Sequence, residues 1–204
     1  MTAIIDYDAG NVRSVLNAMK SLGEEAVLTS DPEEILGADH VIIPGEGAFG
    51  MAMEKIRQRR LEEVILEVAA SGTPFLGICI GQQLLFDASE ESPGVKGLGI
   101  LHGTCRKIKE GDGRKIPEIG WNDLSYPNPG RLFRGIPEHS FVYFVHSYYA
   151  CPDDLSIVTA ANEYGGTLTA SVEKDNVFAC QFHPEKSAEV GRKILSNFLE
   201  VSKC

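Results

Sequence analysis

The chain has 204 residues, with 19 basic and 29 acidic side chains, a formal net charge of −10 and five cysteines. This length suits one α/β domain with a well-buried core and is short for two domains and a linker. The acidic balance, with no basic cluster longer than Arg59-Arg60, excludes a typical nucleic-acid binder, and no apolar run approaches the roughly 20 residues of a membrane span. We expect a single domain over residues 1–204, cytoplasmic, with reduced cysteines and no metal site, because the cysteines are widely spaced and form no C-x-x-C pair.

Strand and helix patterns alternate in the first half of the chain. Short apolar runs predict strands at residues 3–5, 27–28, 41–43 and 74–76. Helical spacing or start signals predict helices over residues 12–22, from Asp31, over 61–70 and over 82–86. This strand-helix order predicts a mostly parallel sheet that helices cover on both faces.

The second half has a different texture. After Gly94, apolar runs broken by Gly, Pro and Asn predict further strands, partly antiparallel, at residues 97–101, 119–124, 141–149, 167–172 and 177–182. An apolar stripe predicts a closing helix that begins at Ser187. No repeat, low-complexity segment or linker divides the chain.

Cys79 carries the most informative chemical pattern. It lies at the centre of Gly-Ile-Cys-Ile-Gly, residues 77–81, between the apolar run at 74–76 and the helix-like run at 82–86. Glycines two residues on either side let backbones approach closely at the strained strand-to-helix turn of a nucleophile elbow. A small buried residue in a Gly-rich turn is the alternative interpretation. A helix N-terminus and a nearby imidazole would favour the thiolate, so we expect Cys79 to be a nucleophile.

A candidate base lies near the other end of the chain. His183 follows the apolar run at 177–182, and Glu185 comes two residues later, on the same face if the segment is extended. His146 also ends an apolar run and competes for this role, but no carboxylate follows it at the same spacing. The other histidines lie near loops without such a companion, at positions 40, 102 and 139. We expect Glu185 to orient His183, and His183 to act on Cys79.

A tetrahedral oxyanion also needs backbone donors. The N–H of Ile80, directly after the nucleophile, is one candidate, and the Gly-rich loop 44–47 at the end of a neighbouring strand can supply another. A simple strand-to-helix turn explains the glycines of that loop equally well. No G-x-G-x-x-G follows a strand and no P-loop motif occurs, so we expect no nucleotide cofactor.

These residues together resemble a known family over essentially the whole chain, the class I (triad-type) glutamine amidotransferases. The resemblance rests on the elbow at residues 77–83 and on His183-Pro184-Glu185. Within the family, the glutaminase subunits of imidazole glycerol phosphate synthase are the most similar, by the segments at 6–7, 10–11, 13–15, 44–50, 120–122, 143–149 and 181–187. The resemblance implies a flavodoxin-like α/β fold, with a mostly parallel central sheet, helices on both faces and additional antiparallel strands.

The same resemblance implies hydrolysis of L-glutamine to glutamate and ammonia through a cysteinyl thioester, without a cofactor. Cys79, His183 and Glu185 would form the catalytic triad. Backbone N–H groups of Glu46 and Ile80 would stabilise the oxyanion. The position-for-position match gives the substrate-binding residues as Gly47, Gln83, Glu91, Ser147 and Tyr148.

The resemblance also implies a partner. Ammonia would pass to a separate (β/α)₈ cyclase subunit, in a heterodimer that makes imidazole glycerol phosphate in histidine biosynthesis. The interface candidates by the same match are Asn11, Trp121, Tyr143 and Lys186.

Two positions depart from the usual pattern of this subunit. Position 46 is usually a small branched apolar residue and position 82 is usually methionine, whereas this chain has Glu46 and Gln82. Three alternatives stay open: the glutaminase partner of pyridoxal phosphate synthase, a cysteine-elbow stress or chaperone-like protein without glutaminase activity, and a regulatory module whose triad no longer turns over. The first would not carry the motifs at 120–122 and 146–149.

Overall fold

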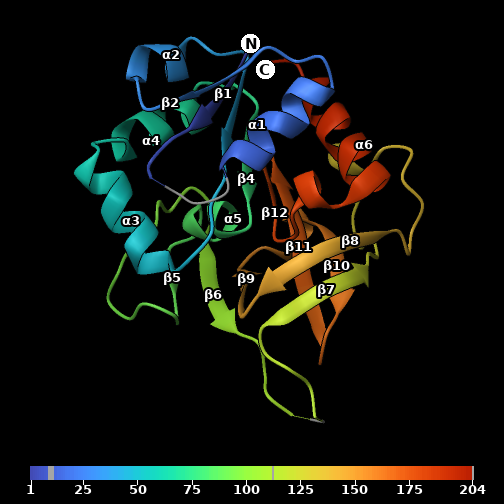
Figure 1. Cartoon of the computed structure of the whole chain (residues 1–204). Helices are drawn as coiled ribbons and strands as arrows, with labels where there is room; N and C mark the ends of the chain where they lie inside the picture. Colours follow the sequence, from blue (N-terminus) through green and yellow to red (C-terminus); the bar gives the residue numbers. More distant parts are fainter. Residues whose placement is uncertain (9–11, 112, 204) are drawn as a thin grey trace.

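A seven-stranded sheet forms the centre of the computed structural model, which describes residues 1–8, 12–111 and 113–203 (Figure 1). The strand order is β10-β11-β12-β4-β3-β1-β2. Its strands are β1 (Thr2–Ile5), β2 (Ala26–Thr29), β3 (His40–Ile43), β4 (Phe75–Ile78), β10 (Val158–Glu163), β11 (Thr167–Lys174) and β12 (Val177–Cys180). Pairing is parallel from β2 through to β12 and antiparallel from β12 through to β10. The predicted mostly parallel sheet with additional antiparallel strands is confirmed.

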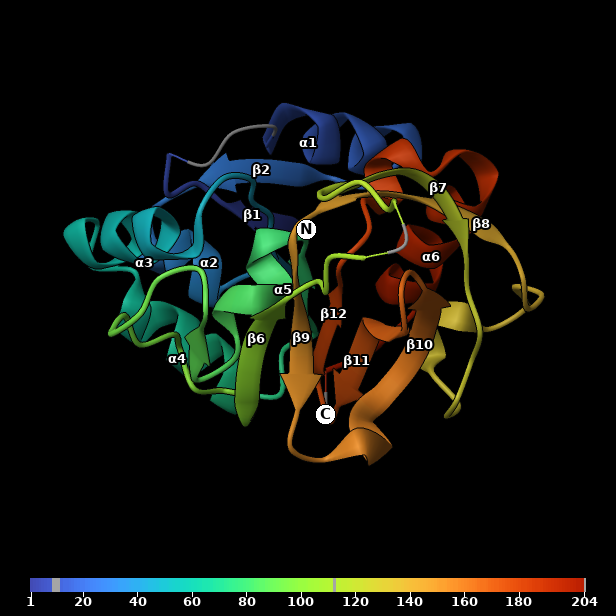
Figure 2. The same ribbon diagram turned by 90° about the horizontal axis from the view of Figure 1, so that it is seen from below.

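Helices cover both faces of this sheet, as predicted (Figure 2). Successive strand residues point to opposite faces, so Ile4 and Ile5 of β1 join two different hydrophobic clusters. The cluster that contains Ile4 is covered by α1 (Val12–Ser21) and α6 (Ala188–Leu199). The cluster that contains Ile5 is covered by α2 (Pro32–Leu36), α3 (Phe49–Gln58) and α4 (Glu62–Ala70). Of these helices, the sequence did not predict α3.

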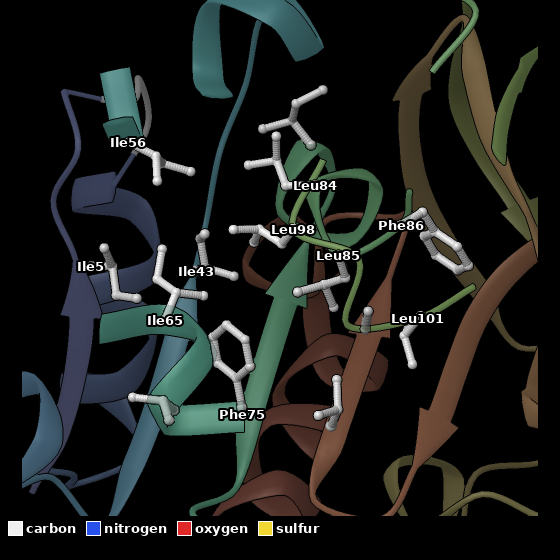
Figure 3. Packing of buried hydrophobic residues seen from close by; sticks show 14 of the residues in the cluster. Ile5, Ile43, Ile56, Ile65, Phe75, Leu84, Leu85, Phe86, Leu98 and Leu101 are labelled. Atoms are coloured by element: carbon white, nitrogen blue, oxygen red, sulfur yellow. The ribbon is translucent and has the colours of Figure 1, made fainter. Parts of the chain in front are cut away.

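The cluster around Ile5 supports the end of the sheet where strands lead into functional loops (Figure 3). Ile43 and Phe75, from neighbouring strands, pack with Ile56 of α3 and Ile65 of α4. The same cluster continues over α5 (Ile80–Leu84) and the residues that follow it. Ile80 and Leu84 of α5 are therefore held in place by apolar packing against the sheet.

Two smaller sheets lie beyond the carboxyl ends of the parallel strands (Figure 1). One contains β5 (Ala88–Ser89), β6 (Gly103–Lys107) and β9 (Tyr148–Pro152), and the other pairs β7 (Glu118–Asp123) with β8 (Phe141–His146). The apolar run predicted as one strand over 141–149 is therefore two strands, in different sheets, divided at Ser147. Two short 3₁₀ helices, η1 (Arg131–Phe133) and η2 (Leu155–Ile157), complete this half.

The strand predicted at 97–101 is wrong. This segment wraps around the end of α5, where the N–H groups of Leu98 and Leu101 donate to the carbonyls of Leu84 and Leu85 at 2.8 and 2.9 Å. Its backbone groups are thus satisfied by helix-end carbonyls, which have no partner within the helix, rather than by a neighbouring strand.

Within the described residues, Cys79, Cys105, Cys151 and Cys180 are free thiols. No helix in the part of the chain that the structure describes combines the length and the apolar character needed to cross a membrane.

Candidate functional site

Cys79 lies in a strained turn between β4 and α5, as a nucleophile elbow requires. Its backbone has φ 56° and ψ −111°, a conformation that costs an ordinary residue about 1–3 kcal/mol. The glycines around it are required for space, because a Cβ at Gly77 would lie 2.8 Å from the carbonyl oxygen of Gly81 and one at Gly81 would lie 2.0 Å from that of Ile43. The N–H of Cys79 donates to Cys180 O at 2.8 Å, which ties the turn to β12.

His183 and Glu185 follow β12, the parallel neighbour of β4. His183 Nδ1 lies 2.8 Å from Glu185 Oε1, and the two side chains are 3% and 1% exposed. The expected extended segment is wrong in its geometry, because residues Pro184–Lys186 form a 3₁₀ helix, η3. The carboxylate reaches the ring from that turn instead. The N–H of His183 donates to Tyr143 O at 2.9 Å and so fixes the segment to β8.

The electrostatic environment of His183 favours the imidazolium. Burial lowers the pKa of His183, but interactions with Cys79 and with Glu185 outweigh burial and raise that pKa from 6.5 to about 10. Its Nε2 atom is buried and has no hydrogen-bond partner among the described residues. With Nδ1 directed at Glu185, Nε2 is the atom that can exchange a proton with a substrate.

His146, the competing candidate base, is occupied elsewhere. Its Nδ1 lies 2.9 Å from Tyr148 O, and its Nε2 lies 3.1 Å from Glu118 Oε2 in a buried pair with 2% and 4% exposed side chains. Glu118 also accepts hydrogen bonds from Asn162 Nδ2 at 3.1 and 3.2 Å. Because both ring nitrogens face protein acceptors, His146 serves as a support for the wall that contains Tyr148 and is not a free base.

The loop after β3 lies beside the start of α5. A Cβ at Gly45 would lie only 2.0 Å from Ile80 Cγ2, so glycine is needed there for close approach. Gly47 has φ +96°, and a Cβ built on it would meet nothing within 4 Å, so glycine is needed there for conformation. Glu46, between them, is exposed. The residue before Glu46 therefore packs directly against Ile80, which brings the loop and the start of α5 together.

These segments enclose a cavity of about 250 Å³, close to the small end of ligand pockets at about 300 Å³. Nine of the predicted site residues line it: Glu46, Gly47, Cys79, Ile80, Gln83, Glu91, Ser147, Tyr148 and His183. Glu185 lies behind His183 and does not line it. Three further residues line it: His146, which the sequence offered only as a competing base, and Pro117 and Val145, which it did not predict as site residues.

Gln83 connects the elbow to the opposite wall. Its Nε2 donates to Tyr148 O and to Gln181 Oε1, both at 2.9 Å. Gln181 Nε2 in turn lies 3.7 Å from Cys79 Sγ, a contact that the sequence did not predict. Its place two residues before His183, directly after β12, was the available signal, because alternate residues of an extended segment share a face. Glu91 is partly committed to structure, because its Oε2 accepts the N–H of Phe49 at 2.7 Å.

Three of the four interface candidates, Trp121, Tyr143 and Lys186, lie on elements next to this site but do not line the cavity. Trp121 of β7 is 52% exposed and meets Tyr143 of β8 edge to face, with ring centroids 6.1 Å apart. Lys186 is exposed in η3, directly after Glu185. Asn11 lies outside the described residues. An apolar surface on the β7–β8 hairpin, which also presents Ile119 and Phe141 at 62% and 54% exposure, therefore adjoins the triad.

Comparisons with known proteins agree with this geometry. The family model for glutamine amidotransferase class-I matches residues 3–201. A HisH subunit of imidazole glycerol phosphate synthase from Bacillus cereus (strain G9842) is 53% identical over 199 residues, which cover 97% of this chain and 93% of the relative. The subunit of that name from Methanothermobacter thermautotrophicus is 47% identical over 201 residues, 98% of each chain. A crystal structure of a glutamine amidotransferase has the same fold, with a TM-score of 0.76 at 23% identity and 97% coverage of both chains.

Proposed function

Since the chain belongs to the class-I glutamine amidotransferases, and within them to the HisH subunits of imidazole glycerol phosphate synthase, we propose that it hydrolyses L-glutamine and supplies ammonia to a cyclase subunit. Residues 1–204 would act as a single glutaminase domain in the cytoplasm. The observation that carries the proposal is the placement of Cys79 and His183 on one cavity, after the carboxyl ends of two adjacent parallel strands, with Glu185 bonded to His183 from behind.

The first half-reaction forms a thioester. The thiolate of Cys79 attacks the side-chain carboxamide carbon of glutamine, and the carbonyl oxygen takes up the negative charge. The N–H groups of Ile80 and Glu46 stabilise this oxyanion. His183 gives its Nε2 proton to the leaving nitrogen, the C–N bond breaks and ammonia departs.

The second half-reaction restores the enzyme. The now neutral Nε2 of His183 takes a proton from a water molecule, which attacks the glutamyl thioester and releases glutamate and the Cys79 thiolate. Glu185 holds the ring with Nε2 toward the substrate and stabilises the imidazolium in both steps.

Substrate recognition and delivery of ammonia use the rest of the site. Gln83 and Glu91 would bind the amino-acid end of glutamine, together with the backbone of Ser147 and Tyr148, and Gly47 would also contact the substrate; the support is that all five line the cavity. The exposed Trp121 on the β7–β8 pair, together with Tyr143 and Lys186, would dock the cyclase. Asn11 is the fourth interface candidate by the sequence match alone.

The test is a glutaminase assay with and without a cognate cyclase subunit and its ligand. Cys79→Ala should abolish glutamine hydrolysis and leave ammonia-dependent cyclisation by the partner intact, because the nucleophile belongs to this chain and the cyclisation site does not. His183→Ala should be nearly as severe. The double variant should be no slower than either single variant, because residues that act as one unit are not additive.

Three outcomes would contradict the proposal. Residual hydrolysis near wild type in Cys79→Ala would remove the triad assignment. Failure of a glutamine-like diazo-ketone to alkylate Cys79 would favour a stress or chaperone-like protein. Stimulation by a pyridoxal phosphate synthase subunit, and not by the cyclase, would assign the glutaminase to a different complex.

A further inference from the structure

Tyr7 lies directly beneath the loop that carries Glu46, and none of the steps above uses it. It follows β1, its side chain is 1% exposed, and its hydroxyl donates to Pro44 O at 2.8 Å. We propose that Tyr7 is a positioning residue for the oxyanion site, whose hydroxyl holds the Pro44–Gly45 peptide so that the N–H of Glu46 faces the reacting carbonyl. The inference rests on the proposed glutaminase function.

The loop is clamped at its first half. A Cβ at Gly45 would lie 2.2 Å from the Tyr7 hydroxyl and 2.0 Å from Ile80 Cγ2, so these two side chains fill the space on that side of Gly45 and leave no room for a substituent. One of the two belongs to the residue that supplies the other oxyanion donor. Tyr7 thus fixes the distance between the two halves of the oxyanion site.

The second half of the loop is open. Gly47 has φ +96°, a Cβ there would meet nothing within 4 Å, and Glu46 is exposed. The amide of Glu46 therefore lies between the Pro44–Gly45 peptide, which Tyr7 holds by a hydrogen bond, and Gly47, which has open space around it. The orientation of that amide depends on the last anchored group before it, which is the Pro44 carbonyl bonded to Tyr7.

Tyr7 is itself well anchored and stays a donor. The segment that carries it is bonded at both ends: Asp6 N–H donates to Thr29 O at 2.8 Å, and Lys55 Nζ donates to Asp8 O at 2.6 Å. Burial, with Cys79 and Glu46 nearby, raises the pKa of Tyr7 well above its usual range. The hydroxyl is therefore protonated at every pH at which the enzyme would be assayed.

The experiment compares Tyr7→Phe with wild type in the complex with the cognate cyclase. Loss of one neutral hydrogen bond should lower kcat for glutamine hydrolysis about three- to tenfold, with KM changed by less than about twofold, because the oxyanion exists only after attack. Tyr126→Phe is the matched control, since the Tyr126 hydroxyl also donates to a proline carbonyl, Pro137 O, at 3.3 Å. It should leave both constants unchanged.

Alkylation of Cys79 by iodoacetamide separates positioning from general damage. The thiolate forms an S–C bond while iodide leaves, and no oxyanion develops, so Tyr7→Phe should react at the wild-type rate. Replacing Tyr7 with 4-aminophenylalanine keeps an N–H donor at the same place and should restore most of kcat.

Three results would overturn the inference: wild-type kcat in Tyr7→Phe, an equal loss of alkylation and hydrolysis, or no recovery with 4-aminophenylalanine. Absence of glutamine hydrolysis in the wild-type complex would instead overturn the proposed function.

Discussion

Gly45→Ala perturbs the oxyanion site at its tightest contact. The new Cβ would lie 2.0 Å from Ile80 Cγ2, whereas carbon atoms in contact prefer about 3.5 Å, so these two atoms must move apart by about 1.5 Å. The added methyl group also approaches the Tyr7 hydroxyl at 2.2 Å, which blocks retreat toward β1. The displacement therefore falls on the two peptides that supply the proposed donors.

The size of the effect follows from that displacement. A misplacement of about 1 Å costs roughly 10² in rate, so we expect kcat for glutamine hydrolysis in the cyclase complex to fall at least about 10²-fold. The rate of glutamate release at saturating glutamine measures kcat. The melting temperature measures the accompanying overpacking cost of about 1–3 kcal/mol.

Gly94→Ala is the control for this variant. A Cβ at Gly94 would meet nothing within 4 Å, and the residue lies in a turn away from the cavity. Its positive φ of +84° makes alanine strained there, so the control also lowers the melting temperature but should keep kcat at the wild-type value. Near-wild-type kcat in Gly45→Ala, at an unchanged melting temperature, would refute the reasoning.

The remaining predictions concern the backbone N–H of Glu46, the buried side-chain amide of Gln82 and the protonation of His183. Glu46→Gln should change the rate of glutamine hydrolysis by less than about tenfold, because the side chain is exposed. Glu46→Pro removes the backbone N–H and should lower that rate roughly 10²–10³-fold. Equal losses of rate in the two variants, at equal cyclase binding, would show that the carboxylate takes part in the reaction. Gln82 is 0% exposed and its amide has no partner among the described residues, so Gln82→Met should stabilise the fold by about 1–3 kcal/mol, at about 2–4 °C per kcal/mol in melting temperature; an unchanged or lower melting temperature would contradict this. The raised pKa of His183 means that its imidazolium stabilises the folded state fully below pH 6.5 and that this stabilisation is lost as the pH rises toward about 10. The melting temperature of wild type relative to His183→Gln should therefore fall over that range, and a rise would show that the sign is wrong.

Most elements in the first half of the chain, α3 excepted, could be predicted because their signals are local. Asp31 illustrates this: its side chain accepts the N–H of Glu33 at 2.9 Å, and Pro32 opens α2 as the sequence indicates. Cys79 was recognisable for a similar reason. A Cβ on either flanking glycine would clash with backbone atoms, at Gly77 with those of the elbow itself and at Gly81 with those of the adjacent strand β3, so the motif shows in the local sequence.

Helix α3 could not be predicted because its start signal comes from elsewhere in the chain. Its N-cap residue, Ala48, makes no side-chain cap hydrogen bond. The first N–H groups of the helix, on Phe49 and Gly50, instead donate to Glu91 Oε2 at 2.7 Å and Ser92 Oγ at 3.0 Å. A cap supplied from about forty residues away leaves no trace in the local pattern.

The change of sheet at Ser147 has the same character. The apolar run on both sides of it satisfies the strand pattern without interruption, yet β8 pairs with β7 and β9 pairs with β6. Between these two strands, the carbonyl oxygen of Ser147 accepts a hydrogen bond from the N–H of Ile108 at 2.9 Å, just after the end of β6. The division depends on pairing between distant segments, which periodicity does not encode.

The sequence does not show why a given glycine is needed in the loop after β3. Gly45 and Gly47 have the same identity and lie two residues apart, and the pattern alone assigns both to turn flexibility. The structure separates them, since Gly45 is needed for space against Ile80 and Tyr7, while Gly47 is needed for its positive φ in open surroundings. Glu46 therefore lies between a glycine held by packing and a glycine in open surroundings. A loop with two free glycines could not hold its donor at a fixed distance from Ile80.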